Sequence, residues 1–465
     1  MVSRPGTHRM NPLDVVILAA GKGTRMQSTL PKVLHPVGGR PMVEHVIRTA
    51  QALLPRRVIV VLGHGMDQVA PGVEALGASI VEQHEQCGTG HAVRHALPQL
   101  PADAARTLIL FGDVPLTRTA SLQRLLAAAS PDQLALLTTR PANPFGYGRI
   151  VRDAAGSVLK IVEEKDATDA ERALGEVNTG IMLVPNRFLH EALLRLRNDN
   201  SQGEYYLTDL VAMARAAGHA VIAVDCPADE TQGINDRVQL AQLERVYQRR
   251  IADELMRAGV TIADPGRIDV RGDFICGTDT FIDVNLVVEG TVRVGSNCRI
   301  GANAVLKDCT IADNVEIRAF THIDGATVAS DGCIGPFARL RPGTRLAPGV
   351  HVGNFVEIKK ASIGEGTKIN HLSYIGDAEI GRNVNVGAGT ITCNYDGVNK
   401  FETRIADGAF IGSNSSLVAP VAVGANATVG AGSVITNDVP DSQLAVARSK
   451  QKNIDGWQRP QKKKD

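Results

Sequence analysis

Hydrophobic positions in the first half of the chain come in short runs that are separated by amphipathic stretches. The runs are residues 15–20, 58–62, 108–111, 134–138 and 181–184. Residues 42–53 and 119–129 lie between them and have polar and apolar positions at helical spacing. Short buried strands alternating with helices predict βαβ units, in which helices cover both faces of a mostly parallel sheet. We expect this α/β domain to occupy residues 1–237.

A different pattern begins after that domain. Residues 238–258 contain neither Gly nor Pro and carry apolar residues at helical spacing, so they predict a linker helix that ends at Gly259. Beyond Gly259 an apolar residue recurs at every sixth position. The three series are Ile282, Val288, Val294 and Ile300; Ile334, Leu340, Leu346, Val352 and Ile358; and Ile405, Ile411, Leu417, Val423, Val429 and Ile435.

This hexapeptide repeat predicts a parallel β-helix over residues 259–465, in which each coil stacks its apolar anchors on the next. Ordinary strands of a sandwich would not keep one six-residue phase through three series. The phase breaks between residues 388 and 404. Insertions in a solenoid form loops on one face, often the binding face, so we expect a functional loop there.

Composition and charge narrow the classes of protein. Hydrophobic residues make up 44% of the 465 residues and charged residues 21%, which is typical of globular chains. The net charge of +1 provides no field that attracts nucleic acid or an anionic membrane. Seven scattered cysteines without C-x-x-C spacing argue against a disulfide framework or a zinc site and favour a reducing compartment.

The two ends of the chain carry little further signal. The first apolar run is too short for a signal peptide or a membrane span, so we expect a cytoplasmic protein. Residues 1–12 predict a flexible start, and the basic run Lys462, Lys463 and Lys464 predicts a solvated tail.

A glycine-rich turn follows the first predicted strand. It reads Leu18, Ala19, Ala20, Gly21, Lys22, Gly23, Thr24, Arg25 and Met26, and Leu30, Pro31 and Lys32 come soon after. Such glycines let backbone amides approach a phosphate chain at the start of a helix, which we expect this turn to open. Met26 stands where a dinucleotide-binding fold has its third glycine, and the Walker phosphate-binding pattern is absent.

The turn and Lys32 together resemble the signature of the sugar-phosphate nucleotidylyltransferases. The resemblance implies a Rossmann-like domain in which Arg25 and Lys32 act on the nucleoside triphosphate. Fixed cations lower the barrier there because charge builds on the α-phosphate as it is attacked. The alternative interpretation is a pair of solvated surface cations.

Asp113 follows the run 108–111 at the carboxyl end of a predicted parallel strand, where open α/β sheets bind their ligands. A carboxylate at that place suits Mg²⁺, which prefers one or two carboxylates together with phosphate oxygens. The resemblance adds Asn235 as a second Mg²⁺ ligand. Taken alone, Asn235 would instead predict the N-cap of a helix.

Other motifs of the same family occur in the expected order. They imply that Gln83, Gly88 and Thr89 recognise uracil and that Gly148, Glu163 and Asn178 form an amino-sugar pocket. The remaining residues implied to contact the nucleotide are Leu18, Ala19, Ala20, Gly21, Phe111 and Gly112. Two positions depart from the family pattern: Phe111 replaces a tyrosine and loses its hydroxyl, and Cys87 replaces a leucine.

A second set of chemically active residues lies in the hexapeptide half, over residues 352–360, 371–377, 385–390 and 393–397. In order and content these segments resemble the acetyltransferase half of the bifunctional N-acetylglucosamine-1-phosphate uridylyltransferase/glucosamine-1-phosphate acetyltransferase family. The resemblance extends over nearly the whole chain from about residue 13.

Acetyl transfer to an amine needs a group that removes a proton near neutral pH, which suits a histidine. We therefore predict His371 as the general base, with Glu357 orienting or polarising its ring. The resemblance implies that Arg341 and Lys359 bind the sugar phosphate and that Tyr374 and Asn385 bind the sugar. It implies acetyl-CoA binding along Ala388, Asn394, Tyr395, Ser413, Ala431 and Arg448.

The amine is expected to attack the thioester directly, with a backbone amide near Ala388 as an oxyanion donor. Cys393 lies beside these residues, so a covalent acyl-cysteine remains an alternative. We predict no metal site in this half, because no histidines there have zinc-ligand spacing.

The full resemblance implies a left-handed β-helix, a homotrimer and an enzyme that makes UDP-N-acetylglucosamine for the bacterial cell envelope. It would acetylate glucosamine 1-phosphate from acetyl-CoA and then use UTP and Mg²⁺ to add the nucleotide, releasing pyrophosphate. In one alternative, the β-helix is a trimerising scaffold on a plain nucleotidylyltransferase. In another, the first domain binds nucleotide only as a regulator of an acyltransferase.

Overall fold

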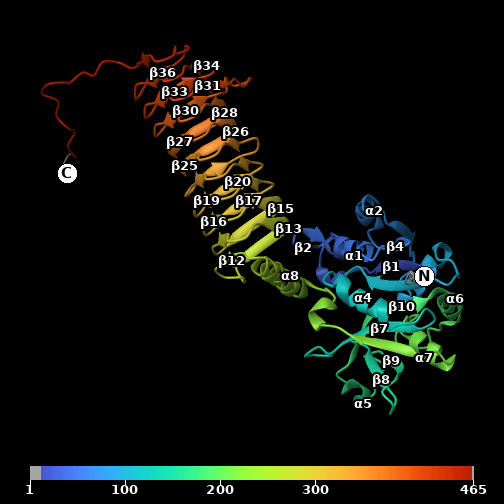
Figure 1. Cartoon of the computed structure of the whole chain (residues 1–465). Coiled ribbons are helices and arrows are strands. Elements are labelled where there is room, and N and C mark those ends of the chain that lie inside the picture. Colours follow the sequence, from blue (N-terminus) through green and yellow to red (C-terminus); the bar gives the residue numbers. More distant parts are fainter. Residues whose placement is uncertain (1–11, 463–465) are drawn as a thin grey trace, which may run out of the picture. The chain divides into compact units, whose positions relative to one another are not determined.

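A computed structural model describes residues 12–462 of the chain. The chain divides into two compact units, Met1–Tyr247 and Gln248–Asp465, and Figure 1 shows the helices and strands of each. The expectation of a flexible start over residues 1–12 lies outside the described residues except at Pro12. That of a solvated tail at Lys462, Lys463 and Lys464 lies outside them except at Lys462, which is exposed.

Unit 1 is built on a nine-stranded sheet whose central strand β1 pairs in parallel with β4 and β6. The strands follow the order β11 (Val221–Asp225), β7 (Leu134–Thr139), β10 (Val177–Pro185), β6 (Arg106–Phe111), β1 (Leu13–Ala19), β4 (Arg57–Leu62) and β5 (Ser79–Glu82). Strands β8 (Arg149–Arg152) and β9 (Val158–Val162) are attached through β10, and β2 (Pro36–Val37) pairs separately with β3 (Arg40–Pro41).

All five predicted buried strands are present, as β1, β4, β6, β7 and β10. The direction of β10 differs from the expected parallel arrangement, because it runs antiparallel to both β6 and β7. An antiparallel neighbour needs no crossover helix, and the β8–β9 hairpin precedes β10 instead. The sheet is therefore mostly, but not wholly, parallel.

Helices cover both faces of this sheet, as the sequence predicted. On one face Val15 and Ile17 of β1 pack with α1 (Met42–Gln51), α2 (Met66–Ala75) and α4 (Thr119–Ala128). On the other face Val16 and Leu18 pack with α3 (Thr89–Ala96), α6 (Asn186–Arg195) and α7 (Asp209–Ala216). Successive side chains of β1 point to opposite faces of the sheet, so one strand contributes to both cores. The short α5 (Asp169–Arg172) lies outside both cores.

The predicted linker helix is present as α8 (Arg237–Arg257). Asp236 begins it, because its Oδ1 accepts a hydrogen bond from the backbone N of Gln239 at 2.8 Å. The residue that caps this helix is therefore Asp236 and not Asn235. Among the helices of residues 12–462, none combines the length and the apolar character that crossing a bilayer requires.

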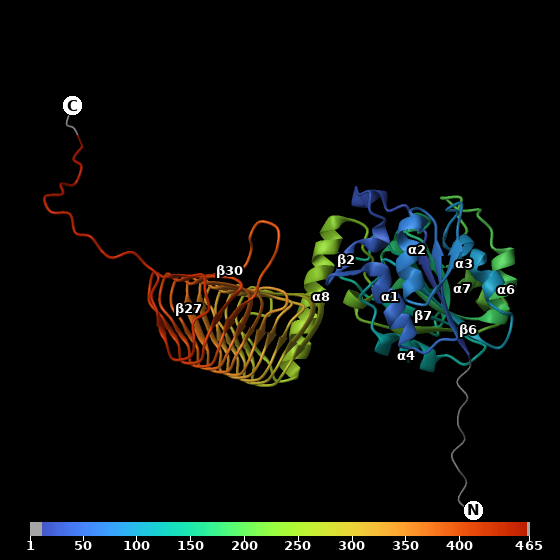
Figure 2. The same ribbon diagram turned by 90° about the horizontal axis from the view of Figure 1, so that it is seen from above.

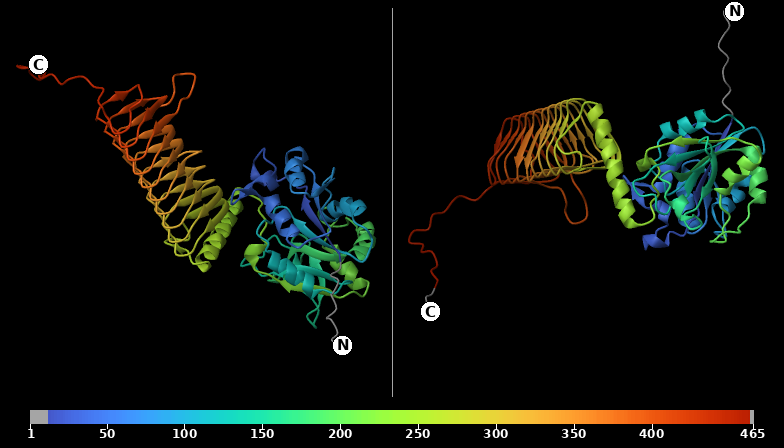
Figure 3. Two further views of the ribbon diagram at one scale, coloured as in Figure 1. Left: turned by 45° about the horizontal axis from the view of Figure 1, so that its top comes forward. Right: turned by 90° about the horizontal axis from the view of Figure 1, so that it is seen from below.

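Unit 2 is a parallel β-helix, whose successive coils stack in one column in Figure 3. One sheet has the order β12 (Thr261–Ile262), β14 (Phe281–Ile282), β16 (Arg299–Ile300), β19 (Glu316–Ile317), β22 (Cys333–Ile334), β25 (His351–Asn354), β27 (Lys368–His371), β29 (Asn385–Val386), β32 (Phe410–Ile411), β35 (Thr428–Val429) and β37 (Leu444–Ala445).

The remaining strands of the coils form a fifteen-stranded sheet. They are β13 (Ile268–Cys276), β15 (Leu286–Val294), β17 (Val305–Lys307), β18 (Thr310–Ile311), β20 (His322–Asp324), β21 (Thr327–Val328), β23 (Arg339–Leu340), β24 (Arg345–Leu346), β26 (Glu357–Ile363), β28 (Tyr374–Ile380), β30 (Ile391–Cys393), β31 (Thr403–Ile405), β33 (Ser416–Val418), β34 (Val421–Val423) and β36 (Val434–Ile435).

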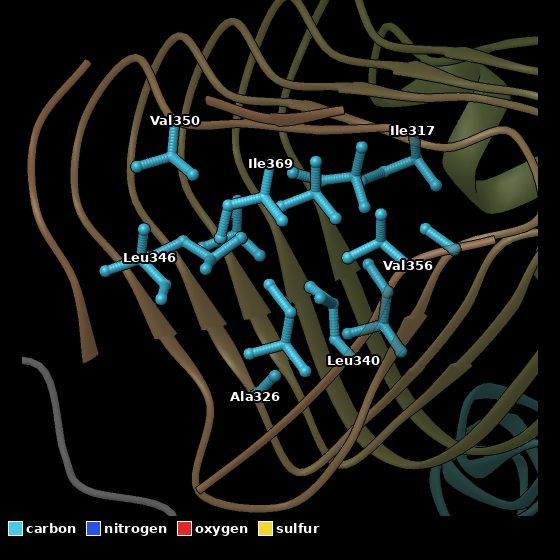
Figure 4. Packing of buried hydrophobic residues seen from close by; sticks show 14 of the residues in the cluster. Ile317, Ala326, Leu340, Leu346, Val350, Val356 and Ile369 are labelled. Carbon is cyan, nitrogen blue, oxygen red and sulfur yellow. The ribbon is translucent and has the colours of Figure 1, made fainter. Parts of the chain in front are cut away.

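The hexapeptide anchors fill the interior of this column. Every anchor predicted from the six-residue period is buried, and Figure 4 shows some of them pointing inward from successive coils. Ile300, Ile317 and Ile334 lie in register on adjacent coils, so each anchor rests on the next. The parallel β-helix is thus confirmed, and its left hand stays a prediction.

The predicted interruption of the repeat is a loop between β30 and β31. It stands out from the column beside β30 in Figure 2. Phe401 returns the chain to the column, because its backbone N donates to the carbonyl of Asn394 at 2.9 Å. The loop therefore begins and ends at one place on the β-helix surface.

Removing part of a core anchor should destabilise unit 2. Leu340 is 0% exposed, so Leu340→Ala loses apolar burial and leaves a cavity, and we expect the free energy of unfolding to fall by about 2–5 kcal/mol. Urea unfolding followed by circular dichroism measures this change as a lower midpoint. Val398→Ala, at a loop side chain that is 84% exposed, is the control and should change stability by less than about 0.5 kcal/mol. Equal losses in both variants would contradict the β-helix core described here.

Candidate active sites

Three side chains from distant parts of the chain meet at the carboxyl end of β6. Lys32 Nζ lies 2.5 Å from Asp113 Oδ2 and 2.9 Å from Asn235 Oδ1. Arg25 Nη2 donates to the same Asn235 oxygen at 2.8 Å. The cations and the metal-ligand candidates predicted from sequence are therefore brought together, at the sheet edge where such folds bind ligands.

A cavity of about 250 Å³ adjoins this cluster. Its lining residues come from the ends of β1, β5 and β6 and from the start of α3. They are Leu18, Ala19, Ala20, Gly21, Lys32, Val33, Gln83, Gln86, Gly88, Thr89, Ala92, Phe111, Asp113 and Glu204. Ten of these were predicted to contact the nucleotide, whereas Val33 and Gln86 carried no predicted role.

The glycine turn does not open the α-helix that we expected. The structure has only a three-residue 3-10 helix, Thr24–Met26, at this place. Gly23 before it and Gln27 after it both adopt left-handed backbone angles, with φ of 60° and 46°, which a regular helix cannot contain. Any phosphate bound here would therefore meet the turn and the cations rather than the N-terminus of a long helix.

The predicted amino-sugar residues form a second cluster. The backbone N of Asn178 donates to the carbonyl of Gly148 at 2.8 Å, and a Cβ on Gly148 would lie 3.4 Å from the Glu163 carboxylate. Thr208 Oγ1 donates to Glu163 Oε1 at 2.9 Å. Burial raises the pKa of Glu163, and the Thr208 hydrogen bond opposes this only in part.

Phe111 links this cluster to the cavity. A Cβ on Gly180 would lie 2.6 Å from the Phe111 ring, and Gly180 has a positive φ of 86°. The backbone N of Gly180 also donates to Asn178 Oδ1 at 3.1 Å. The ring is thus packed although the hydroxyl of the expected tyrosine is missing. At the other departure, Cys87, the carbonyl accepts a hydrogen bond from Tyr205 N at 2.9 Å, a contact that any side chain would allow.

In unit 2 the predicted base His371 has a different partner from the one expected. Its Nδ1 lies 2.8 Å from Asn354 Oδ1, and the two residues are in register on adjacent coils. Glu357 Oε1 instead accepts from Arg341 Nη1 at 2.7 Å. The charged guanidinium offers that carboxylate a strong, charge-assisted bond, and the role of Glu357 in orienting His371 stays a prediction.

Cations gather around Lys359. Lys400, from the insertion loop, lowers the pKa of Lys359 by hydrogen bonding and charge repulsion, and Arg341 adds a smaller effect in the same direction. Lys400 and Asn354 are not among the residues predicted to form this site. Lys400 could have been found from the interrupted repeat, and Asn354 from its place one coil before His371.

The residues predicted to bind the sugar lie on neighbouring coils. A Cβ on Gly376 would lie 2.5 Å from the Tyr374 hydroxyl and 2.9 Å from Asn394 Nδ2. Asn394 Nδ2 also donates to Asp377 Oδ2 at 2.5 Å. Asn385 begins β29, which pairs with the strand that carries His371.

The predicted acetyl-CoA residues form a ladder along one corner of the column. Ala388 and Ser413 accept from the backbone N of Asn414 and Gly432 at 2.7 and 2.8 Å, so each lies beside the next coil. A Cβ on Gly412 would lie 2.5 Å from Ala431 N, and Arg448 Nη1 donates to Ala431 O at 2.5 Å. Tyr395 is 60% exposed where the insertion loop begins.

Comparison with known proteins gives these two sites their context. Residues 15–208 match the family model of the MobA-like NTP transferase domain. Residues 402–437 match the bacterial transferase hexapeptide (six repeats), and residues 291–319 match the hexapeptide repeat of succinyl-transferase. The chain is also 58% identical over 455 residues to the bifunctional protein GlmU of Marinobacter nauticus, covering 97% of this chain and 100% of that protein.

The chain belongs to the bifunctional GlmU family. It is 57% identical over 453 residues to the GlmU proteins of Cellvibrio japonicus and Stutzerimonas stutzeri, which also cover 97% of this chain. The predictions of a bifunctional uridylyltransferase and acetyltransferase that makes UDP-N-acetylglucosamine are thus confirmed. Membership in the GlmU family does not support the alternatives of an inert β-helix or of a purely regulatory first domain.

Replacing the half-buried carboxyl of Glu163, in the predicted amino-sugar cluster, should stabilise unit 1. The folded chain holds a proton on Glu163 more tightly than the unfolded chain, because its pKa is raised, so ionisation at neutral pH opposes folding. Glu163→Gln removes this effect and should raise the free energy of unfolding at neutral pH. The gain should vanish below the ordinary pKa of glutamate, where the carboxyl is protonated in both states.

Thermal or urea unfolding of both proteins over a series of pH values measures this difference. Glu74→Gln, at an exposed position of α2, is the control and should change stability little at any pH. A parent protein that is more stable than Glu163→Gln at neutral pH would contradict the prediction.

Proposed function

We propose that unit 2 transfers the acetyl group to glucosamine 1-phosphate at His371, and that unit 1 then joins the product to UTP at Lys32 and Asp113. The observation that carries this assignment is that each unit holds a separate cluster of side chains suited to one of the two reactions. In unit 1, Lys32, Asp113 and Asn235 meet within hydrogen-bonding distance. In unit 2, Asn354 holds His371, and Arg341, Lys359 and Lys400 form a group of cations.

In the uridylyl step, a phosphate oxygen of N-acetylglucosamine 1-phosphate attacks the α-phosphorus of UTP. The bond between the α- and β-phosphates breaks, and pyrophosphate leaves with the electron pair. Arg25 and Lys32 neutralise the charge that builds on the phosphate oxygens during this displacement. Both side chains already converge on one oxygen of Asn235, which places the two cations close together.

A Mg²⁺ ion fits the same place. Asp113 and Asn235 supply hard oxygen ligands, and both already approach one cation, Lys32 Nζ, at 2.5 and 2.9 Å. Within residues 12–462, no group of three or more His, Cys, Asp and Glu side chains is placed to hold a metal. Few protein ligands suit Mg²⁺, which keeps phosphate oxygens and waters as its remaining ligands. When bound, the ion would neutralise phosphate charge and orient the triphosphate.

In the acetyl step, His371 is suited to act as the base. Asn354 Oδ1 can only accept, so the hydrogen bond at 2.8 Å requires the His371 proton to lie on Nδ1. The lone pair of Nε2 is then free to take the proton from the sugar amine. The amine nitrogen attacks the thioester carbon, the C–S bond breaks, and coenzyme A leaves as the thiolate.

The group of cations in unit 2, Arg341, Lys359 and Lys400, is suited to the sugar phosphate. Glu357 holds the Arg341 guanidinium by a hydrogen bond at 2.7 Å, so it acts on the phosphate site rather than on the base. Lys359 and Lys400 repel one another, as the lowered pKa of Lys359 indicates. A phosphate dianion between them would remove that repulsion, so substrate binding and proton uptake by Lys359 should favour each other.

We further propose that the chain forms a homotrimer in the cytoplasm. Phe320, Phe337 and Phe355 stack along the outside of the column, with ring centroids 5.0 and 5.3 Å apart. Each of these rings is about half exposed, and Leu372, next to the base, is 62% exposed. A continuous apolar ridge on the surface is typical of an interface between copies of a chain.

Replacing Asp113 should separate the two activities. Asp113→Asn weakens the proposed metal site and should lower uridylyl transfer by roughly 100-fold or more, since such an ion contributes several kcal/mol of charge stabilisation. Acetyl transfer should stay unchanged. Pyrophosphate release and free-thiol release measure the two steps, and Asp67→Asn on the exposed start of α2 is the control. Loss of both activities in Asp113→Asn would contradict the assignment.

Replacing His371 should have the opposite effect. His371→Ala should lower acetyl transfer by roughly 10²- to 10⁴-fold, because a positioned base contributes about that much, while uridylyl transfer stays unchanged. The same two assays apply. His351→Ala provides a matched control, because His351 is an exposed histidine two coils before Asn385 and carries no proposed role. If thiol release persists in His371→Ala, another group removes the amine proton.

A further inference from the structure

The side chain of Gln83 is a buried polar group in the wall of the nucleotide cavity. It directly follows β5 and is 3% exposed. Its backbone N donates to Leu62 O at 2.7 Å, and its carbonyl accepts from Gln86 Nε2 at 3.3 Å. These two hydrogen bonds fix the backbone of Gln83 but leave open the orientation of its side-chain amide. One end of that amide accepts hydrogen bonds and the other donates, so its orientation decides what it can recognise.

His91 holds this amide in one orientation. Gln83 Nε2 lies 3.0 Å from His91 Nδ1. An amide NH₂ group can only donate, so Nδ1 must be the unprotonated ring nitrogen and the proton must lie on Nε2. With its NH₂ group donating to His91, Gln83 has its carbonyl oxygen Oε1 available to a ligand in the cavity.

The His91 ring is itself fixed by its neighbours. It lies on α3 and packs edge-on against His95, with ring centroids 4.6 Å apart, and it stacks on Tyr205 at 6.1 Å. Arg94 lies over the Tyr205 ring at 4.7 Å. The backbone of Tyr205 accepts from Gly90 N at 2.8 Å and donates to Cys87 O at 2.9 Å. These contacts position the acceptor nitrogen before any nucleotide binds.

We propose that His91 is a positioning residue that makes unit 1 select uracil over cytosine. This inference depends on the proposed uridylyl transfer and on the predicted contact of Gln83 with the uracil of UTP. N3 of uracil carries a hydrogen, which Gln83 Oε1 can accept. N3 of cytosine carries a lone pair, which would face Oε1 and repel it. Without the acceptor on His91, the Gln83 amide could turn and offer its NH₂ group to cytosine.

A purely structural role for His91 would give a different result. Loss of packing in α3 would lower kcat/KM for UTP and CTP by the same factor. Loss of the amide orientation would change their ratio, because a site built to pair with one hydrogen-bonding edge rejects the wrong edge by leaving groups unpaired. The ratio of the two kcat/KM values therefore separates the two roles.

The test uses the full chain, N-acetylglucosamine 1-phosphate and Mg²⁺, and follows pyrophosphate release with UTP and with CTP. His91→Phe keeps a ring without an acceptor, and His91→Leu is a second acceptor-free variant. In both we expect the preference for UTP to fall by roughly 10-fold. His91→Asn places an amide oxygen as far from Cβ as Nδ1 is, so it should restore most of the preference. His95→Phe, which packs on His91 without contacting Gln83, should leave the ratio unchanged.

The variant Gln83→Leu separates two possible failures: that His91 does not orient Gln83, and that Gln83 does not contact the base of UTP. A preference that falls in Gln83→Leu but not in His91→Phe or His91→Leu would overturn the role of His91 alone. A preference that stays unchanged in Gln83→Leu would overturn the assignment of Gln83 as a base contact, and the role of His91 with it. A fall in the Gln83, His91→Phe and His91→Leu variants, with recovery in His91→Asn, is the expected result.

Discussion

Both proposed active sites depend on parallel strands that pair in a fixed register, because the residues of each site are far apart along the chain. In unit 1, β1 pairs with β6 so that Leu18 lies opposite Phe111, and the glycine turn and Asp113 leave the sheet at one edge. In unit 2, β25 pairs with β27 so that Asn354 lies opposite His371. A slip of one residue would move these side chains to the opposite face. The buried apolar positions that hold the register therefore also hold the sites.

Unit 2 holds like charges close together. The pKa of Lys359 is lowered chiefly by Lys400, and the opposing effect of Asp377 is too small to restore it. Arg341, by contrast, has Glu357 as a partner at 2.7 Å. Charges that repel one another in the folded chain are more typical of ligand sites than of structural ion pairs, because binding energy offsets the strain. This contrast supports a phosphate site at the two lysines.

The sequence predicted the architecture well where a pattern repeats and less well where one residue decides. The β-helix could be predicted from anchors such as Ile334 and Leu340, because every coil repeats the same apolar positions. One atypical residue therefore does not change the prediction. The glycine turn has no such redundancy. We expected a helix after the turn, but left-handed backbone angles at Gly23 and Gln27 limit it to the three residues Thr24–Met26. The spacing of apolar residues does not indicate the backbone angles of a single residue such as Gln27. The early end of the helix could therefore not be predicted from the sequence.

The same difference explains which parts of the sites could be predicted. Residue types and their order indicated His371, Glu357 and Arg341, but not which of them pair. Glu357 has both a histidine and an arginine within one coil, and the charge-assisted bond to Arg341 prevails. His371 then takes the neutral Asn354, its neighbour in register. A carboxylate at Nδ1 would favour the protonated ring, whereas an amide oxygen fixes the tautomer and adds no charge. The unexpected pairing with Asn354 thus fixes one tautomer of the proposed base.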